Sequence, residues 1–152
     1  MTDAATSQPR RPPRHPRADG ERTRAAILRA AASLATTDGL EGLSIGNLAA
    51  ATGMSKSGLY AHFGTKQDLQ LATVAEAERV LHAEVIAPAL AAPPGLAQLA
   101  AACEAFLSYV ERRVFPGGCF FVATALEMGT RPGQPGAGKA RDLCDGQHRW
   151  LK

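Results

Sequence analysis

The feature that most constrains this chain is a pair of short helical patterns, separated by Gly53, between residues 43 and 66. In the first pattern, residues of one helix face recur at the i, i+3, i+4 and i+7 positions: Ile45, Leu48, Ala49 and Thr52. In the second, Leu59 and Phe63 stand four residues apart, and Ser55 precedes them as a side chain suited to cap a helix N-terminus. Gly53 tolerates the positive φ that a sharp turn between helices requires. The spacing predicts a helix-turn-helix.

The outer face of the second predicted helix carries side chains that suit a nucleic acid. These side chains are small, basic or polar: Lys56, Ser57, Gly58, Tyr60 and His62. Hydroxyls, ammonium groups and helix N-terminal amides bind phosphates, whereas side chains that reach the groove floor read base edges. We therefore expect residues 56–63 to enter a DNA groove, with Gly58 leaving room for a close approach.

The ordered run from Gly53 to Phe63, followed by Lys66 and Leu69, resembles the DNA-binding domain of the TetR family of transcriptional repressors. Further matches lie upstream: Ile27, Leu28, Ala30, Ala31, Leu34, Gly39, Leu43, Ser44, Ile45, Leu48 and Ala49. The resemblance implies an all-α fold, in which a three-helix DNA-binding domain with its helix-turn-helix precedes a helical domain for ligand binding and dimerisation. It also implies a ligand-responsive repressor that binds a palindromic operator in double-stranded DNA as a homodimer.

The resemblance and the polar face together give a set of expected DNA-binding residues: Ser44, Ser55, Lys56, Ser57, Gly58, Tyr60, His62 and Lys66. Ser57, Gly58 and Tyr60 are expected to face bases or the adjacent sugar–phosphate. The remaining five are expected to hold phosphates.

Charge is distributed unevenly along the chain. Residues 1–66 carry nine Lys or Arg and five Asp or Glu, a balance of +4, whereas residues 67–152 carry eight and nine, a balance of −1. A basic first part suits a nucleic-acid module joined to a part that binds other partners, although a solvated surface explains the charge equally well.

Three segments follow from composition and pattern. Residues 1–20 hold four prolines and four arginines without apolar periodicity, which predicts a disordered basic tail. Its arginines, Arg10, Arg11, Arg14 and Arg17, either lie along DNA or belong to a simple soluble leader. Residues 21–66 form the predicted DNA-binding domain, and residues 67–152 form a partial helical domain for effector binding and dimerisation.

Helical patterns continue on both sides of the motif. We expect a supporting helix over residues 21–37, and a capping box from Thr65 to Asp68 that starts a long linker helix. One side of this linker carries Leu71, Val74, Leu81 and Val85, and Pro88 should kink or end it. Residues 96–114 show a strong apolar stripe, residues 119–128 are apolar enough for an interior helix, 129–139 are Gly/Pro-rich, and 140–152 begin another helix.

Residues 117–121 resemble the start of the sixth helix in one group of these repressors, where the later helices enclose a small, largely apolar effector. By this analogy the candidate ligand-binding residues are Phe106, Tyr109, Cys119, Phe120, Leu126 and Met128. Ordinary core packing is the alternative for each of them. Family members usually continue with two long helices that pair across a dimer. Those helices are absent from this sequence, so we expect either a truncated chain or a dimer with a reduced surface.

Other classes of protein fit the sequence less well. The three cysteines form no CxxC pair and suit a reducing cytoplasm, and no apolar run reaches the roughly 20 residues of a membrane span. Cys144 and His148 stand four residues apart, but two ligands make a weak metal site. We expect no enzyme activity, no metal and no cofactor. Two alternatives remain: a helical small-molecule-binding protein without DNA affinity, and a truncated regulator fragment that does not dimerise.

Overall fold

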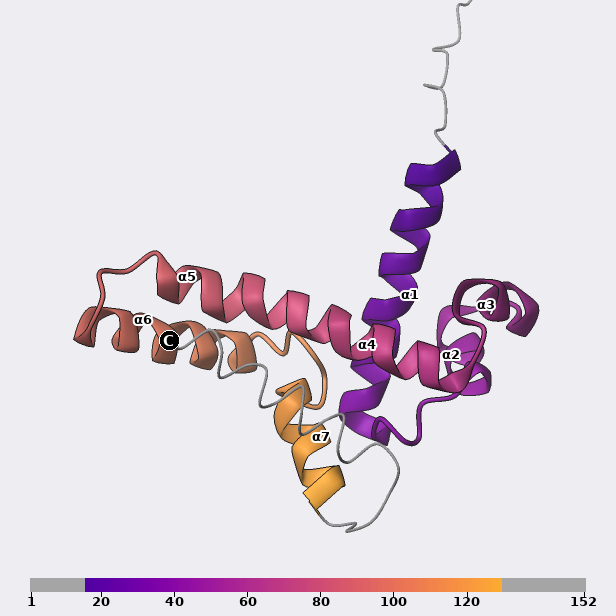
Figure 1. The fold of residues 1–152 in the computed structure, drawn as a ribbon. Coiled ribbons are helices and arrows are strands. Elements are labelled where there is room, and N and C mark those ends of the chain that lie inside the picture. The colour runs from indigo at the N-terminus through magenta and orange to yellow at the C-terminus, as the bar shows by residue number, and fades with distance from the viewer. Residues whose placement is uncertain (1–15, 130–152) are drawn as a thin grey trace, which may run out of the picture.

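Helices and short connections make up the part of the chain that the computed structural model describes, residues 16–129, and no strand occurs within it (Figure 1). The helices follow in this order: α1 (Pro16–Asp38), α2 (Ile45–Thr52), α3 (Lys56–Phe63), α4 (Lys66–Leu81), the π-helical η1 (His82–Ile86), α5 (Ala87–Leu90), α6 (Leu96–Glu111) and α7 (Phe120–Gly129). The predicted all-α class with a helix-turn-helix is confirmed. No helix among the described residues is long and apolar enough to span a membrane.

Several expectations lie outside the described residues: Arg10, Arg11 and Arg14 of the tail, the Gly/Pro-rich segment from residue 130 onwards, the helix over residues 140–152, and the Cys144–His148 pair.

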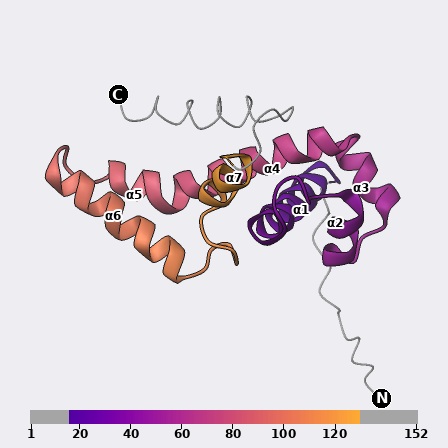
Figure 2. The same cartoon turned by 90° about the horizontal axis from the view of Figure 1, so that it is seen from below.

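The helices α1, α2 and α3 form a unit that we call the head (residues 16–63), at one end of the molecule (Figures 1 and 2). Its core is apolar and includes Ile27, Ala31, Leu48, Leu59 and Phe63. α1 packs against α2 and also along α4, so it supports the helix-turn-helix as predicted.

Helix α1 begins earlier than the sequence predicted. It starts at Pro16 instead of Glu21, so residues 16–20 of the predicted disordered tail are helical. Proline is tolerated in the first turn of a helix because the N–H it lacks would have no partner there. Asp19 in this turn accepts a hydrogen bond from Arg22 at 2.8 Å, which adds a local ion pair.

The sequence predicts that Pro88 kinks or ends the linker, and the structure excludes an end at Pro88, because the helix continues to Leu90. α4, η1 and α5 follow one another without a break from Lys66 to Leu90. Proline removes an intrahelical donor and its ring crowds the carbonyl four residues earlier. The π-helical turn of residues 82–86 includes the residue four positions before Pro88, whose carbonyl the ring would crowd. Leu71, predicted on the apolar side, is exposed, whereas Val74 and Val85 are buried.

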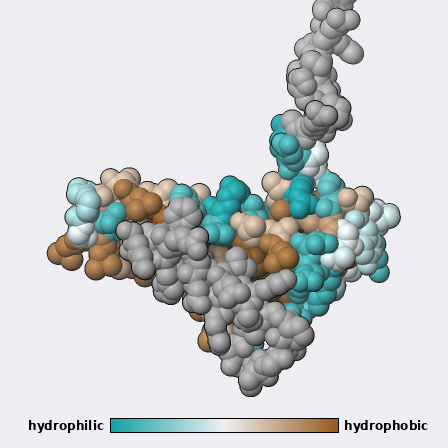
Figure 3. Space-filling model, viewed as in Figure 1, coloured by the Kyte–Doolittle hydropathy of each residue, from teal (hydrophilic) through white to brown (hydrophobic). Residues whose placement is uncertain are grey.

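Helix α6 runs back along α5 and η1 as the second arm of a hairpin (Figures 1 and 2). The apolar stripe of α6 is mostly uncovered, with Leu96 82% and Leu99 61% exposed. Figure 3 shows hydrophobic residues, in brown, on the surface of the hairpin at the left of the view. Among the residues of α6 only Tyr109 is buried. Within the described chain α5 and η1 are its main helical partners, so one side of the stripe lacks a cover.

Helix α7 lies between the hairpin and the head and packs against α1 (Figure 2). The prediction of an interior helix is wrong, because Val122 and Leu126 are 52% and 67% exposed while Phe120 and Thr124 are buried. The apolar composition of α7 did not imply burial, because only one side of α7 packs against the protein, at the C-terminal part of α1.

Candidate nucleic-acid interface

Two serine caps and one glycine define the helix-turn-helix. The hydroxyl of Ser44 accepts a hydrogen bond from the Asn47 N–H at 3.1 Å and starts α2. Gly53 ends α2 with φ of 67°, in the left-handed region that glycine favours. The hydroxyl of Ser55 then accepts from the Gly58 N–H at 3.1 Å and starts α3. These caps and this turn confirm the local predictions.

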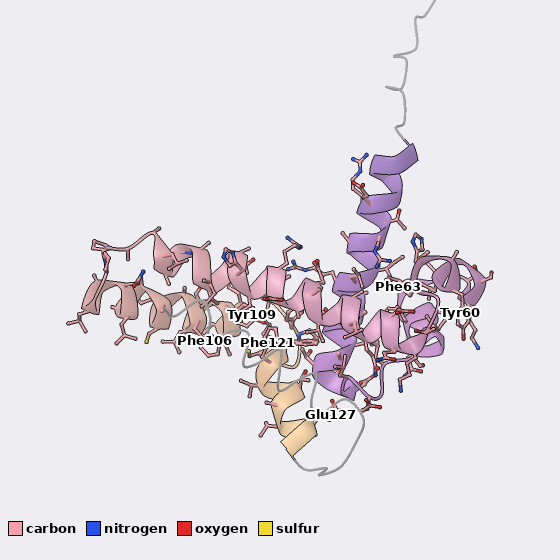
Figure 4. The ribbon with its side chains drawn as sticks, viewed as in Figure 1. Tyr60, Phe63, Phe106, Tyr109, Phe121 and Glu127 are labelled. Atoms are coloured by element: carbon pink, nitrogen blue, oxygen red, sulfur yellow. The ribbon has the colours of Figure 1, made fainter. Side chains whose placement is uncertain are left out.

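The polar face of α3 points away from the molecule. Tyr60 is 54% exposed, and Lys56 and Ser57 are exposed beside it, whereas Leu59 and Phe63 are buried in the core of the head. Figure 4 shows Tyr60 on the outer side of α3, away from α1. None of the ion pairs among the described residues involves Lys56, so its ammonium group faces solvent. This face is therefore open to a partner.

Packing within the protein also favours a glycine at position 58. A Cβ at this position would lie 3.1 Å from the Ser55 hydroxyl, which caps α3 and also forms a hydrogen bond with the Ser57 hydroxyl at 3.2 Å. The glycine thus leaves space for the cap as well as for an approaching surface.

The other predicted phosphate ligands have partners within the protein. The Lys66 ammonium donates a hydrogen bond to the Glu41 carbonyl at 2.6 Å and lies 3.8 Å from the Glu41 carboxylate. His62 is half-buried, with its ring 6.0 Å from the ring of Phe63. Ser44 is half-buried and occupied by its cap. The open part of the predicted site is therefore the first two turns of α3.

Arg24 of α1 belongs to the site but was missed in the sequence. Its guanidinium donates a hydrogen bond to the His62 carbonyl at 2.7 Å and lies 4.6 Å from the centre of the Phe63 ring. A cation at the C-terminal end of a helix also meets the negative end of the helix dipole. Arg24 therefore fixes the last turn of α3 against α1. A single arginine in a polar first stretch of helix gave no periodic pattern that could have identified it.

The candidate ligand-binding residues do not share one environment. Tyr109 and Phe120 are each 1% exposed and pack with Phe115, whose ring meets the Tyr109 ring edge-on at 6.3 Å. Phe106 is partly exposed and its ring stacks on that of Tyr109 at 6.1 Å. Cys119 is half-buried, Leu126 is largely exposed, and the side chain of Met128 lies outside the described part.

Within this aromatic cluster, the pKa of Tyr109 is raised to about 12, chiefly by burial and further by the nearby Cys119. Figure 4 places Phe106, Tyr109 and Phe121 together near the junction of α6 and α7.

Comparisons with known proteins agree with this geometry. A model described as "Bacterial regulatory proteins, tetR family" matches residues 27–73, which include α2, α3, the C-terminal half of α1 and the start of α4. A second, described as "Tetracyclin repressor-like, C-terminal domain", matches residues 95–142.

A crystal structure of a TetR transcriptional regulator from Chloroflexus aurantiacus J-10-FL is similar, with 29% sequence identity and a TM-score of 0.66. The match covers 85% of this chain and 65% of that one, so the chain spans less than two thirds of its relative. No curated protein sequence matches the chain.

Proposed function

Because the chain belongs to the TetR family of bacterial regulators, we propose that it binds duplex DNA through α3 and regulates transcription. The observation that carries this proposal is the uncovered polar face of α3, with Tyr60, Lys56 and Ser57 exposed over a buried apolar face. A helix with this division has one side for the protein core and one side for the major groove.

In the proposed complex, the N-terminal half of α3 lies deepest in the major groove. Ser57, Gly58 and Tyr60 face base edges or the adjacent backbone, and Lys56 and Ser55 meet phosphates. Lys56 suits this role because its ammonium is exposed and makes no ion pair within the described chain. Ser44, His62 and Lys66 are second candidates for phosphates, since Ser44 and His62 are half-buried, unlike Ser55, and the Lys66 ammonium already bonds to the Glu41 carbonyl.

Repression follows in this proposal from occupation of a promoter by a homodimer. Two copies of α3 then lie about 34 Å apart, one turn of B-DNA, so the operator is palindromic. The uncovered apolar residues of α6 and α7 support self-association, because exposed apolar patches of this kind mark interaction surfaces. They include Leu96, Leu99, Leu107 and Leu126.

We further propose that a small, largely apolar effector controls the affinity for DNA from the region of α6 and α7. The match of residues 95–142 to a tetracyclin repressor-like C-terminal domain supports this region. A ligand shifts such an equilibrium only through its different affinities for two arrangements. Here the two arrangements would differ in the angle of the linker, α4 to α5, which joins the hairpin to the head.

The test combines association state with DNA selection. Sedimentation of the purified chain should give a dimer at tens of micromolar, and selection from random duplexes should enrich a palindrome with half-sites about one helical turn apart. The DNA upstream of the chain's own gene is the first natural candidate. A monomer that enriches an unpaired half-site would retain DNA binding but contradict the dimer. Absence of binding to any duplex at low salt would contradict the proposal as a whole and favour a helical protein that binds small molecules only.

A further inference from the structure

A glutamate of the C-terminal part holds the loop that precedes the helix-turn-helix. We define the α1–α2 loop as residues 39–44, and its Leu40 N–H donates to one carboxylate oxygen of Glu127 at 2.7 Å. The Glu41 N–H donates to the other oxygen at 3.1 Å. The partners are 87 and 86 residues apart in the sequence, and Figure 4 places Glu127 on α7 near the end of α1. Paired hydrogen bonds that N–H groups donate to one carboxylate are charge-assisted and therefore strong.

Gly39 is fitted to this contact in two ways. Its φ of +82° lies in the region that favours glycine, and a Cβ built on it would lie 2.7 Å from Oε1 of Glu127. Any other residue at this position would therefore both strain the loop and push the carboxylate away.

Side chains of α4 bind the backbone carbonyl groups of the same loop. The Gln70 side-chain amide donates to the Leu40 carbonyl at 2.8 Å, and the Lys66 ammonium donates to the Glu41 carbonyl at 2.6 Å. Leu40 and Leu43 are buried in the core. The loop is thus fixed through both N–H and carbonyl groups, from α7 on one side and α4 on the other.

The position of the α1–α2 loop determines the position of the helix-turn-helix. The loop ends at Ser44, whose hydroxyl caps α2, and α2 packs against α3. A shift of Leu40 and Glu41 would consequently move the start of α2 and, through it, the exposed face of α3.

A second contact fixes α7 on the same end of α1. The Gly117 N–H donates to the Thr36 hydroxyl at 3.0 Å, and the Thr36 carbonyl lies so close that a Cβ on Gly117 would overlap it. Because α7 is held both before its first turn and near its end, the carboxylate of Glu127 has a fixed place.

We infer that Glu127 is a positioning residue for DNA binding, so that α7 completes the head although it lies beyond the predicted DNA-binding domain of residues 21–66. The inference rests on the proposed function, and it names α7 as a direct route between the C-terminal helices and α3, which we call the recognition helix. Movement of α7 would release the α1–α2 loop without first moving α4.

The test is Glu127→Gln in the full chain, with Glu104→Gln as the matched control on the exposed part of α6. The glutamine is nearly isosteric, but its amide NH₂ cannot accept a hydrogen bond, so one of the two loop N–H groups loses its acceptor. We expect the rate of amide hydrogen exchange at Leu40 and Glu41 to rise about tenfold. The Kd for the selected operator should also rise about tenfold, which corresponds to the loss of about one charge-assisted hydrogen bond.

The control separates positioning from electrostatics. Both variants remove one negative charge, which by itself should tighten binding to a polyanion. Weaker binding by Glu127→Gln therefore has the opposite sign from a charge effect. Circular dichroism gives the folded fraction, so that the Kd refers to folded protein. Glu127→Asp keeps the charge on a shorter stem and should fall between wild type and Glu127→Gln.

Three results would overturn the inference. Faster exchange of Leu40 and Glu41 with a DNA affinity equal to that of Glu104→Gln would make Glu127 merely structural. Unchanged exchange in Glu127→Gln would mean that the contact does not hold the loop in solution. A wild-type chain that binds no duplex would instead reject the proposed function, and this inference with it, before any variant is compared.

Discussion

Replacement of Arg24 by methionine measures how firmly α1 holds the recognition helix. The change removes the hydrogen bond to the His62 carbonyl at 2.7 Å and the guanidinium over the Phe63 ring at 4.6 Å, while it keeps an unbranched side chain with good helix propensity. A charge-assisted hydrogen bond contributes about 1.5–3 kcal/mol, and a cation–π contact at a partly exposed site contributes about 0.5–1 kcal/mol.

Arg24 is half-buried, so the lower end of these ranges applies. We expect the free energy of unfolding to fall by about 2 kcal/mol. For a chain of this size, that loss lowers Tm by about 4–8 °C.

The assay is urea unfolding followed by circular dichroism, in which the midpoint should move and the slope should not. Arg22→Met is the matched control, since it removes the same charge from the same helix, and its ion pair with Asp19 is largely exposed. Such surface pairs contribute about 0–1 kcal/mol. A double-mutant cycle with Phe63→Leu separates the ring contact from the hydrogen bond. If Arg24→Met lies within about 0.5 kcal/mol of Arg22→Met, α1 does not hold α3 in the way that the geometry requires.

Three further predictions concern the interface and the aromatic cluster. Tyr60→Ala should weaken operator binding by about 10- to 100-fold, as expected for loss of a base-reading side chain, and Tyr60→Phe should show how much belongs to the hydroxyl; retained affinity would remove Tyr60 from the interface. Lys66→Ala should weaken binding to all sequences alike and reduce the slope of log K against log salt by about one. An unchanged slope would mean that its ammonium stays with Glu41. In the Tyr60→Phe variant Tyr109 is the only tyrosine, and its phenolate absorbance should appear with a midpoint of about 12. The unfolded phenol ionises at about 10, so stability should fall as pH rises from about 10 to about 12; a folded midpoint near 10 would contradict the burial argument.

The local structure of the head was predictable because its causes lie within a few residues. Ser44 and Ser55 cap helices that begin at the next residue, and Gly53 has the positive φ that a turn after α2 needs. The capping box of Thr65 and Asp68 is present as predicted, with the Asp68 N–H bonded to the Thr65 hydroxyl at 3.0 Å. Each of these interactions joins groups no more than three residues apart.

Contacts between distant polar groups were not predictable in the same way. Arg24 reaches a carbonyl 38 residues away, and Glu127 reaches N–H groups 86 and 87 residues away. A side chain that bonds to backbone leaves no complementary residue in the sequence, because every residue except proline offers the same N–H. The contribution of α7 to the head therefore became visible only in three dimensions.

Periodicity was informative about which residues share a helix face and uninformative about what covers that face. The stripe of α6 was identified correctly, yet Leu96 and Leu99 are exposed. The pattern predicts Leu71 on the apolar side of the linker, but Leu71 is exposed, and Val80 is buried instead. The linker packs against α1 through α4 and against α6 through η1 and α5, and its own sequence does not specify these partners.

The grip of Glu127 on Leu40 and Glu41 also has a consequence for the order of events during synthesis. The chain is synthesised from its N-terminus, so α1 to α4 are translated before residue 127. Until then the two loop N–H groups lack the Glu127 carboxylate as acceptor, and hydrogen bonds from α4 reach only the carbonyl groups of the loop. An incomplete nascent chain should therefore hold α3 less firmly and bind chromosomal operators weakly. Tight binding should begin only after translation has supplied the Glu127 carboxylate.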